Sequence, residues 1–223
     1  MTGDDQVRIW TAAEVDDGQV PAEQLPPVRE ILAWARDFLV SAHPDLGRSG
    51  PVCPYTQPSL RKGLFYLASL VDTGTGTDVG EVVEGLRTWY EDLSQPLSTS
   101  DQELLTILLV LPQMDHQDST ELDEVQRKAK ARFVADGLMI GQFHPVCDEP
   151  GLWNHDFKAL RAPVPLLAIR KLVVFDLPFV MDTDVHAESY LERFAPDIPT
   201  RIRDQLVKRV AKNNNNNLQT ANG

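Results

Sequence analysis

His144 is the side chain in this sequence whose setting most favours chemistry. It follows the apolar run LMIG within the segment GQFHPVCDEP, residues 141–150. Pro145 restricts the backbone that follows, so we expect the imidazole to be held rigidly where a strand leaves its sheet. A neutral imidazole in such a place can bind haem iron or another metal, or act as a base. The alternative is a structural histidine that caps the strand end and bonds to backbone carbonyls.

The two cysteines, Cys53 and Cys147, are too few for a disulfide scaffold and lack the paired spacing of a zinc site. Cys53 lies between prolines in GPVCPY and is either a nucleophile or a small buried hydrophobic residue. Cys147 follows His144 by three residues, but one His-x-x-Cys pair supplies only two metal ligands. We therefore expect reduced thiols.

Aromatic and basic side chains flank the same segments of the chain. Arg161 and Arg170 bracket the sequence APVPLLAI and could meet carboxylates or haem propionates, or pair with surface acids. Aromatic rings near a planar cofactor would be expected if one binds, although core packing explains them equally well. The aromatic residues in question are Tyr55, Phe143, Trp153 and Phe157.

Hydrophobic periodicity predicts the elements that must position these residues. The aliphatic run at 104–111 ends at Pro112 and is typical of a central strand covered on both faces. His43 follows the first predicted helix and is expected to cap its C-terminal end. The predicted helices span residues 28–39, 79–93, 119–137, about 186–195 and 198–210, and the predicted strands span 64–71, 104–111, 138–143 and one or two segments of 164–175.

Two long loops connect these elements. Residues 43–58 contain four prolines and two glycines, which disfavour regular structure, and residues 144–163 form the second loop. Long, stiff loops that carry aromatic residues often form binding sites. We predict that the two loops lie together at one edge of the sheet and wall a single pocket.

The order of elements predicts an α+β fold with a mixed central sheet of about four to five strands and helices packed on it. We expect a loosely ordered leader over residues 1–24, a single domain over 25–211 and a low-complexity tail over 212–223. The net charge of −12 disfavours nucleic acid and anionic lipid as partners. No apolar run approaches the ~20 residues of a membrane span, and the first residues lack a signal peptide, so we expect a cytoplasmic protein.

Several common catalytic motifs are missing from the chain. The turn GTGT lacks the Lys-Ser/Thr of a phosphate-binding loop. There is also no Gly-x-Ser-x-Gly elbow and no His-Glu-x-x-His helix. Hydrolase and nucleotide-binding functions are therefore disfavoured.

Four segments, in this order, resemble uncharacterised bacterial families that carry a domain of unknown function. The segments are WARDFLVSAHPDLGRSGPVCPY, ELLTILLVLPQ, LMIGQFHP and LRAPVPLLAIRKLVVFD, which together span residues 34–176. The matching residues are Cys53, Pro54, Tyr55, Pro112, Phe143, His144, Pro145, Pro163 and Pro165.

A more distant resemblance is to the YqcI/YcgG-type haem proteins, whose members include N-oxygenases acting on guanidine or amine groups. It rests on Gly141 to Pro145, with one extra residue before the His-Pro, and this chain has the acidic VCDEPG where that family has a basic segment. The resemblance implies haem b with His144 as the proximal iron ligand. The pocket residues would then be Cys53, Tyr55, Phe143, Arg161 and Arg170.

Three functions are compatible with these patterns. The first is a haem-dependent oxygenase or oxidase of a small molecule in specialised metabolism, supplied by an unidentified electron donor. The second is a cofactor-free binding or accessory protein. The third is a thiol enzyme in which His144 serves as the base for Cys53. The oligomeric state is open, with a homodimer as one option.

Overall fold

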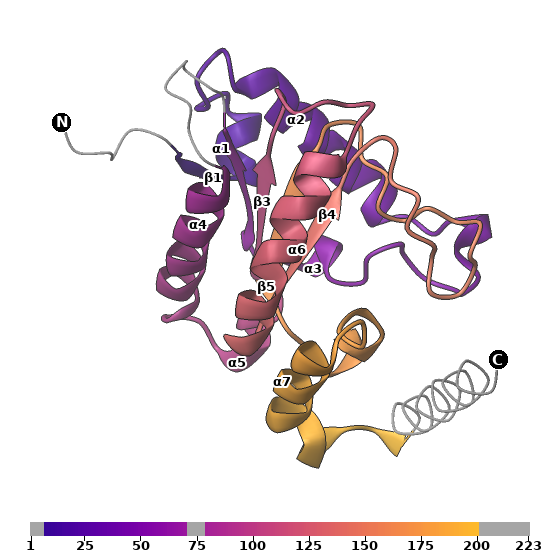
Figure 1. Cartoon of the computed structure of the whole chain (residues 1–223). Helices are drawn as coiled ribbons and strands as arrows, with labels where there is room; N and C mark the ends of the chain where they lie inside the picture. Colours follow the sequence, from indigo (N-terminus) through magenta and orange to yellow (C-terminus); the bar gives the residue numbers. More distant parts are fainter. Residues whose placement is uncertain (1–6, 71–78, 201–223) are drawn as a thin grey trace. The chain divides into compact units, whose positions relative to one another are not determined.

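The computed structural model describes residues 7–70 and 79–200 of the chain (Figure 1). These residues form two compact units that divide between Leu172 and Val173. The first unit contains a five-stranded mixed sheet with helices packed against it. The predicted α+β class and the predicted number of strands are therefore confirmed.

The strand order in the sheet is β1-β2-β3-β5-β4. Strands β2 and β3 run parallel, and the other neighbouring pairs are antiparallel. Every residue of β3 from Ile107 to Val110 is buried, which confirms the aliphatic run as the central strand. The strands are β1 (Ile9–Thr11), β2 (Phe65–Ser69), β3 (Thr106–Val110), β4 (Leu138–Phe143) and β5 (Leu166–Lys171).

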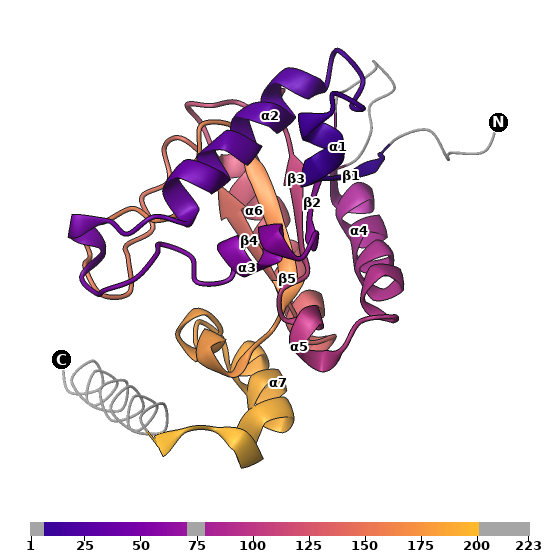
Figure 2. The same cartoon turned by 180° about the vertical axis from the view of Figure 1, so that it is seen from behind.

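Hydrophobic clusters occupy both faces of the sheet, because alternate strand residues point to opposite sides. In β5, Leu166 and Ala168 belong to the cluster beneath α1 and α2, whereas Leu167 and Ile169 belong to the cluster beneath α4 and α6. Figure 1 shows α4 and α6 in front of the sheet, and Figure 2 shows α2 and α3 on the opposite side. The helices of this unit are α1 (Ala12–Asp16), α2 (Leu25–Trp34), α3 (Thr56–Arg61), α4 (Val79–Ser94), α5 (Thr99–Gln102) and α6 (Thr120–Ala135).

The first predicted helix is present, but its last residues form a π-helical turn rather than an α-helix. Helix α2 continues into a π-helical turn over Ala35–Leu39, so that residues 28–39 are helical as predicted. The following loop is not wholly irregular. It contains a 3₁₀ turn at Pro44–Leu46 and a β-bridge between Ala42 and Pro51, and α3 begins at Thr56, before the predicted loop end.

His43 does not cap the preceding helix, so that prediction is wrong. Its Nδ1 accepts a hydrogen bond from the backbone N–H of Asp45 at 3.2 Å. The residue is therefore an N-terminal cap of the 3₁₀ turn that follows, where the proline at position 44 fixes the backbone of the first turn residue.

The predicted loosely ordered leader is contradicted over residues 7–24. These residues include β1, which pairs with β2, and α1, which is capped reciprocally by Thr11 and Glu14. Trp10 and Val15 are completely buried. Both elements are too short to show a hydrophobic period, and their stability comes from packing on the sheet.

The segment at 164–175 supplies one strand, β5, rather than two. In the second unit, a 3₁₀ segment (Val174–Phe179) precedes α7 (Asp184–Phe194), which confirms the helix predicted near 186–195, and a 3₁₀ turn follows at Ala195–Asp197. Within this unit the hydroxyl of Tyr190 donates a hydrogen bond to the carbonyl of Val174.

Some predictions fall outside the described residues. These are the GTGT turn, most of the helix predicted over 198–210, and the tail over 212–223. The single domain over 25–211 stays a prediction. No helix in the described ranges 7–70 and 79–200 has the length and apolar character needed to cross a membrane.

Candidate ligand-binding site

An open hollow of about 670 Å³ lies where the two long loops meet the end of α2. This volume is within the range of ordinary small-molecule sites, ~300–1,000 Å³. The lining combines aromatic rings with charged and polar side chains. It consists of Trp34, Phe38, His43, Asp45, Asn154, Asp156, Phe157, Lys158 and Arg161.

The π-helical turn positions the aromatic floor of the hollow. Trp34 immediately precedes this turn and Phe38 lies within it, and their rings stack with centroids 5.9 Å apart and planes inclined by 26°. Phe143, at the end of β4, packs its ring edge to face with Trp34 at 5.8 Å. Turns of this kind are rare and frequently lie at functional sites.

The two loops contact each other directly, as predicted. The amide of Asn154 donates a hydrogen bond to the backbone carbonyl of Asp45 at 2.8 Å. The ring of His43 lies 4.8 Å from that of Phe157, which also packs on Phe38 at 6.1 Å. Residues of both loops therefore line one hollow, but neither Cys53 nor His144, which were predicted to share it, is among the lining residues.

Glycines allow the close approach of these loops. Gly47 has φ +77°, and a Cβ atom there would lie 2.9 Å from the backbone carbonyl carbon and oxygen of Trp153. A Cβ atom at Gly151 would lie 2.7 Å from the carbonyl oxygen of Asn154. Neither position has space for a side chain without movement of the backbone, so the wall of the hollow is tightly packed.

The polar lining is held by hydrogen bonds to the same loop. Arg161 donates from Nε to the carbonyl of Cys147 at 3.0 Å and from Nη2 to the carboxylate of Asp148 at 2.7 Å. The Lys158 ammonium donates to the backbone carbonyl of Asp148 at 2.7 Å. The predicted site residue Arg161 is thus a lining residue of the hollow.

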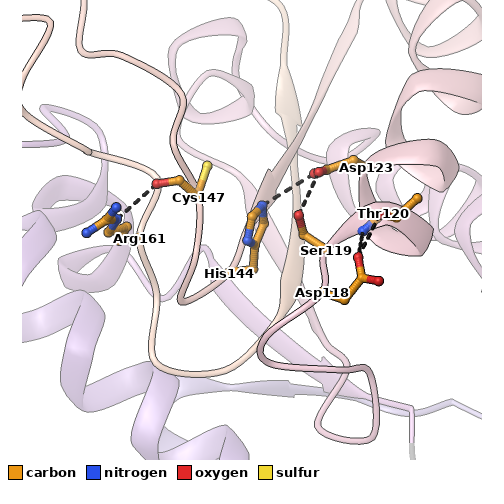
Figure 3. Close-up of polar contacts among 7 residues, drawn as sticks. All are labelled: Asp118, Ser119, Thr120, Asp123, His144, Cys147 and Arg161. Carbon is orange, nitrogen blue, oxygen red and sulfur yellow. Dashed lines mark hydrogen bonds and ion pairs between the residues drawn. The ribbon is translucent and has the colours of Figure 1, made fainter.

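His144 lies outside this hollow, on the side of the sheet covered by α6. Its side chain is only 4% exposed, and its Nε2 lies 3.4 Å from the Oδ1 of Asp123, which belongs to the first turn of α6 (Figure 3). Ser119 donates to the other oxygen of that carboxylate at 2.8 Å. The contact between His144 and Asp123 is close enough for an ion pair but is not aligned as a hydrogen bond, and Nδ1 has no hydrogen-bond partner within the described part of the chain.

The backbone of His144 anchors the base of the second loop. Its N–H donates to the carbonyl of Leu160 at 3.3 Å, and its carbonyl accepts from the backbone N–H groups of Cys147 and Ala162 at 3.2 and 3.4 Å. The expectation that its ring nitrogens would bond to backbone carbonyls is wrong, because the ring contacts a carboxylate instead. The structural alternative for this residue is nevertheless favoured by its burial and its backbone contacts.

Cys147 is a buried thiol near His144 (Figure 3). Burial raises the pKa of the Cys147 thiol; a hydrogen bond from the Glu149 backbone opposes this rise, and the carboxylates of Glu149, Asp123 and Asp148 add to it. A thiol in such surroundings stays protonated and is a poor nucleophile.

The six residues predicted to hold a cofactor do not form one site. Four of them lie on the α2 side of the sheet. Cys53 and Phe143 pack against the hydrophobic cluster on that side. The Arg170 guanidinium lies on the same side, 5.5 Å from the centroid of the Tyr55 ring. His144 lies on the α6 side. Because successive strand residues point to opposite faces, Phe143 and His144 diverge at the end of β4.

This arrangement does not fit haem bound through His144. Nε2 faces the Asp123 carboxylate, and the remaining ring nitrogen, Nδ1, is buried. A haem ligand instead directs an open nitrogen at the iron while the other nitrogen meets the second-shell acceptor. Among the described residues there is also no group of three or more His, Cys, Asp or Glu side chains that could hold a metal ion.

Most residues of the hollow were missed by sequence reasoning. Trp34 and Phe38 are spaced like core residues of an amphipathic helix, and nothing in their spacing marks the π-helical turn. Asp45, Asn154 and Lys158 are ordinary loop residues in sequence. The only signal that pointed to the hollow was the pair of long loops rich in proline and aromatic residues.

The fold and the hollow define a mixed-sheet α+β protein with an aromatic, ligand-sized site at one edge of its sheet. The chain belongs to the family defined by the DUF6875 domain of unknown function, which matches residues 28–205. The predicted membership of a domain-of-unknown-function family is thereby confirmed. No curated protein and no solved structure shows a significant match to the chain.

Proposed function

We propose that this protein binds a small molecule with a flat, apolar body in the hollow between its two long loops. The observation that carries the proposal is the ring stack of Trp34 and Phe38 at the π-helical turn, which lines an open volume of about 670 Å³. Aromatic rings provide a large, rigid apolar contact at little cost in side-chain entropy.

The packing of the loops also supports binding. A site is more effective when its walls are ordered before the ligand arrives, because less conformational entropy is then lost on binding. The hydrogen bond from Asn154 to Asp45 and the close approach of Gly47 to Trp153 hold the two loops together through contacts within the protein. The proposal thus follows the sequence-based expectation of a small-molecule partner.

The proposal favours the binding-protein hypothesis over the two enzymatic ones. The thiol enzyme requires Cys53 and His144 to meet, and they lie on opposite sides of the sheet. Haem-dependent oxygenation, and the likeness to YqcI/YcgG-type proteins that suggested it, rest on His144 and gain no support from its geometry. They stay untested predictions, as do a homodimer and the exclusion of nucleic acid.

The experiment uses the tryptophans as probes. The chain has four tryptophans, so protein labelled with 5-fluorotryptophan gives a ¹⁹F spectrum that can be assigned with single Trp→Phe variants. We expect a library of aromatic fragments to contain members that shift the Trp34 resonance in a saturable manner. Trp10 is buried in the core and serves as an internal reference.

A pair of matched variants tests where the fragments bind. Phe38→Ala removes half of the ring stack and should weaken binding of the fragments that shift Trp34. Phe175→Ala removes the same side chain from a position in the second unit that is 47% exposed, and it should leave binding unchanged. A library that leaves Trp34 unmoved, or equal effects of the two variants, would refute the proposal.

A further inference from the structure

We infer that the ligand of the hollow is a zwitterion with an aromatic body, of the chemical class of aromatic amino acids. This inference rests on the proposed function and specifies the charges that the ligand carries. It is based on the distribution of acidic and basic side chains along the loop that forms one wall.

Contacts across the second loop order its residues from base to tip. At the base, His144 pairs with Leu160, and Arg161 bonds to the carbonyl of Cys147. Further out, Lys158 bonds to the carbonyl of Asp148. The backbone N–H of Gly151 then donates to the carbonyl of Phe157, which closes the tip.

The basic side chains of the wall, Arg161 and Lys158, lie nearer the base of this loop than Asp156 does. Arg161 is already neutralised by the Asp148 carboxylate at 2.7 Å. The Lys158 ammonium donates to a neutral carbonyl, and within the described ranges no carboxylate pairs with it. Lys158 therefore offers an uncompensated positive charge to the hollow.

The acidic side chains gather at the tip. The backbone N–H of Asp156 donates to Asn154 at 3.0 Å, and Asn154 in turn holds Asp45 of the first loop. The Asp45 carboxylate lies 3.9 Å from the Nδ1 of His43, but this nitrogen accepts a hydrogen bond from the Asp45 N–H and so does not donate one to the carboxylate. The carboxylates of Asp45 and Asp156 therefore lie at this end of the wall, and both residues line the hollow.

Phe157 lies between these groups in the chain, with Asp156 before it and Lys158 after it, and its ring packs on Phe38. The wall thus presents the carboxylates of Asp45 and Asp156 at its outer end, the Phe157 ring next to them, and the Lys158 ammonium on the side nearer the base of the loop. A ligand with an ammonium group, a flat apolar body and a carboxylate matches all three parts. A ligand with a single charge leaves one of the two ends without a partner.

The test compares four compounds of similar size by titration of the Trp34 ¹⁹F resonance. They are phenylalanine, phenethylamine, 3-phenylpropionate and 2-phenylethanol, which carry both charges, the positive charge, the negative charge and no charge. Exposed ion pairs contribute only modestly to the free energy of binding, so we expect each ligand charge that meets an opposite charge in the hollow to tighten binding roughly threefold. Phenylalanine should therefore bind about tenfold more tightly than 2-phenylethanol.

Charge-neutralising variants assign each charge of the ligand to a residue. Asp156→Asn should weaken the binding of phenylalanine and phenethylamine, and Lys158→Gln should weaken the binding of phenylalanine and 3-phenylpropionate. Lys128→Gln makes the same change of charge on α6, at a residue that does not line the hollow, and should alter none of the four affinities.

The outcomes separate this inference from the proposed function. If 2-phenylethanol binds as tightly as phenylalanine, or if one singly charged compound binds most tightly, the ligand is not a zwitterion. The proposal that the hollow binds a small aromatic molecule would then still hold. If no compound of this set and no aromatic fragment moves Trp34, both proposals fail.

Discussion

Gly47→Ala is expected to destabilise the protein by separating the two loops that wall the hollow. Gly47 adopts φ +77°, in the left-handed region, and lies directly against the backbone of Trp153. The added methyl group would lie 2.9 Å from both the carbonyl carbon and the carbonyl oxygen of that residue. The obstacle is backbone, so no side-chain rotation can relieve the overlap.

The magnitude follows from two contributions. An alanine in the left-handed region costs roughly 1 kcal/mol relative to glycine. Forcing an extra carbon into a packed contact costs ~1–3 kcal/mol more. Gly47→Ala should therefore lower the free energy of unfolding by about 2–4 kcal/mol.

Gly63→Ala is the matched control. Gly63 also has a left-handed backbone, with φ +67°, but a Cβ atom there would have no neighbour within 4 Å. This variant should lose only the conformational contribution, roughly 1 kcal/mol. Urea denaturation followed by circular dichroism gives both values, and the ¹⁹F resonance of Trp153 should shift in Gly47→Ala alone.

Equal losses of stability in the two variants would refute this reasoning, because the steric contribution would then be absent. An unshifted Trp153 resonance in Gly47→Ala would refute the predicted displacement of the second loop. If the steric argument holds, Gly47→Ala should also weaken the binding of ligands detected at Trp34, since the displaced segment carries Asn154 and its neighbours.

Four further predictions follow from single sites. Gly85→Ala, at an exposed position of α4 with open space around it, should raise the free energy of unfolding by about 0.5–1 kcal/mol in urea denaturation, and a loss would contradict this view of the helix. In native protein, iodoacetamide should modify the half-buried Cys53 before the buried Cys147, whose thiol pKa is raised by burial; mass spectrometry that finds the reverse order would refute this. Protein expressed with a haem precursor should show no Soret band, and a band that disappears in His144→Ala would restore the haem oxygenase hypothesis. The pKa of Glu14 is lowered from 4.5 because its carboxylate accepts hydrogen bonds from the backbone and side chain of Thr11. The stabilisation from this carboxylate is therefore present above pH 4.5 and is lost as the pH falls through the folded pKa. Glu14→Gln should flatten this part of the profile of stability against pH, and an unchanged slope would contradict the role of Glu14 in the cap.

The sequence by itself determined the elements whose character is local. The unbroken aliphatic run around Leu108 predicted the central strand, because a strand buried on both faces has no polar residues to alternate with. Helix α6 and strand β4 were likewise indicated by periodicity and by Gly137 between them. The α+β class follows from the order of such elements.

The sequence also determined that two of the predicted cofactor residues face opposite ways. Phe143 and His144 are neighbours at the end of a strand, and a period of two places neighbours on opposite faces of a sheet. If the extended backbone continues through both residues, their side chains cannot contact the same face of a cofactor. The short β1 and α1 lacked such a signal, because elements of three and five residues are held by burial of Trp10 and Val15 rather than by propensity.

Only the tertiary structure decided the functional site. The hydrogen bond between Asn154 and Asp45 joins residues 109 positions apart, and no local pattern encodes such a contact. Trp34 and Phe38 have the spacing of core residues, and whether such a ring is covered or lines a hollow depends on where the two loops pack. Local periodicity thus specified the strands and helices, whereas contacts distant in sequence determined which side chains face a ligand, because these depend on the path of the whole chain.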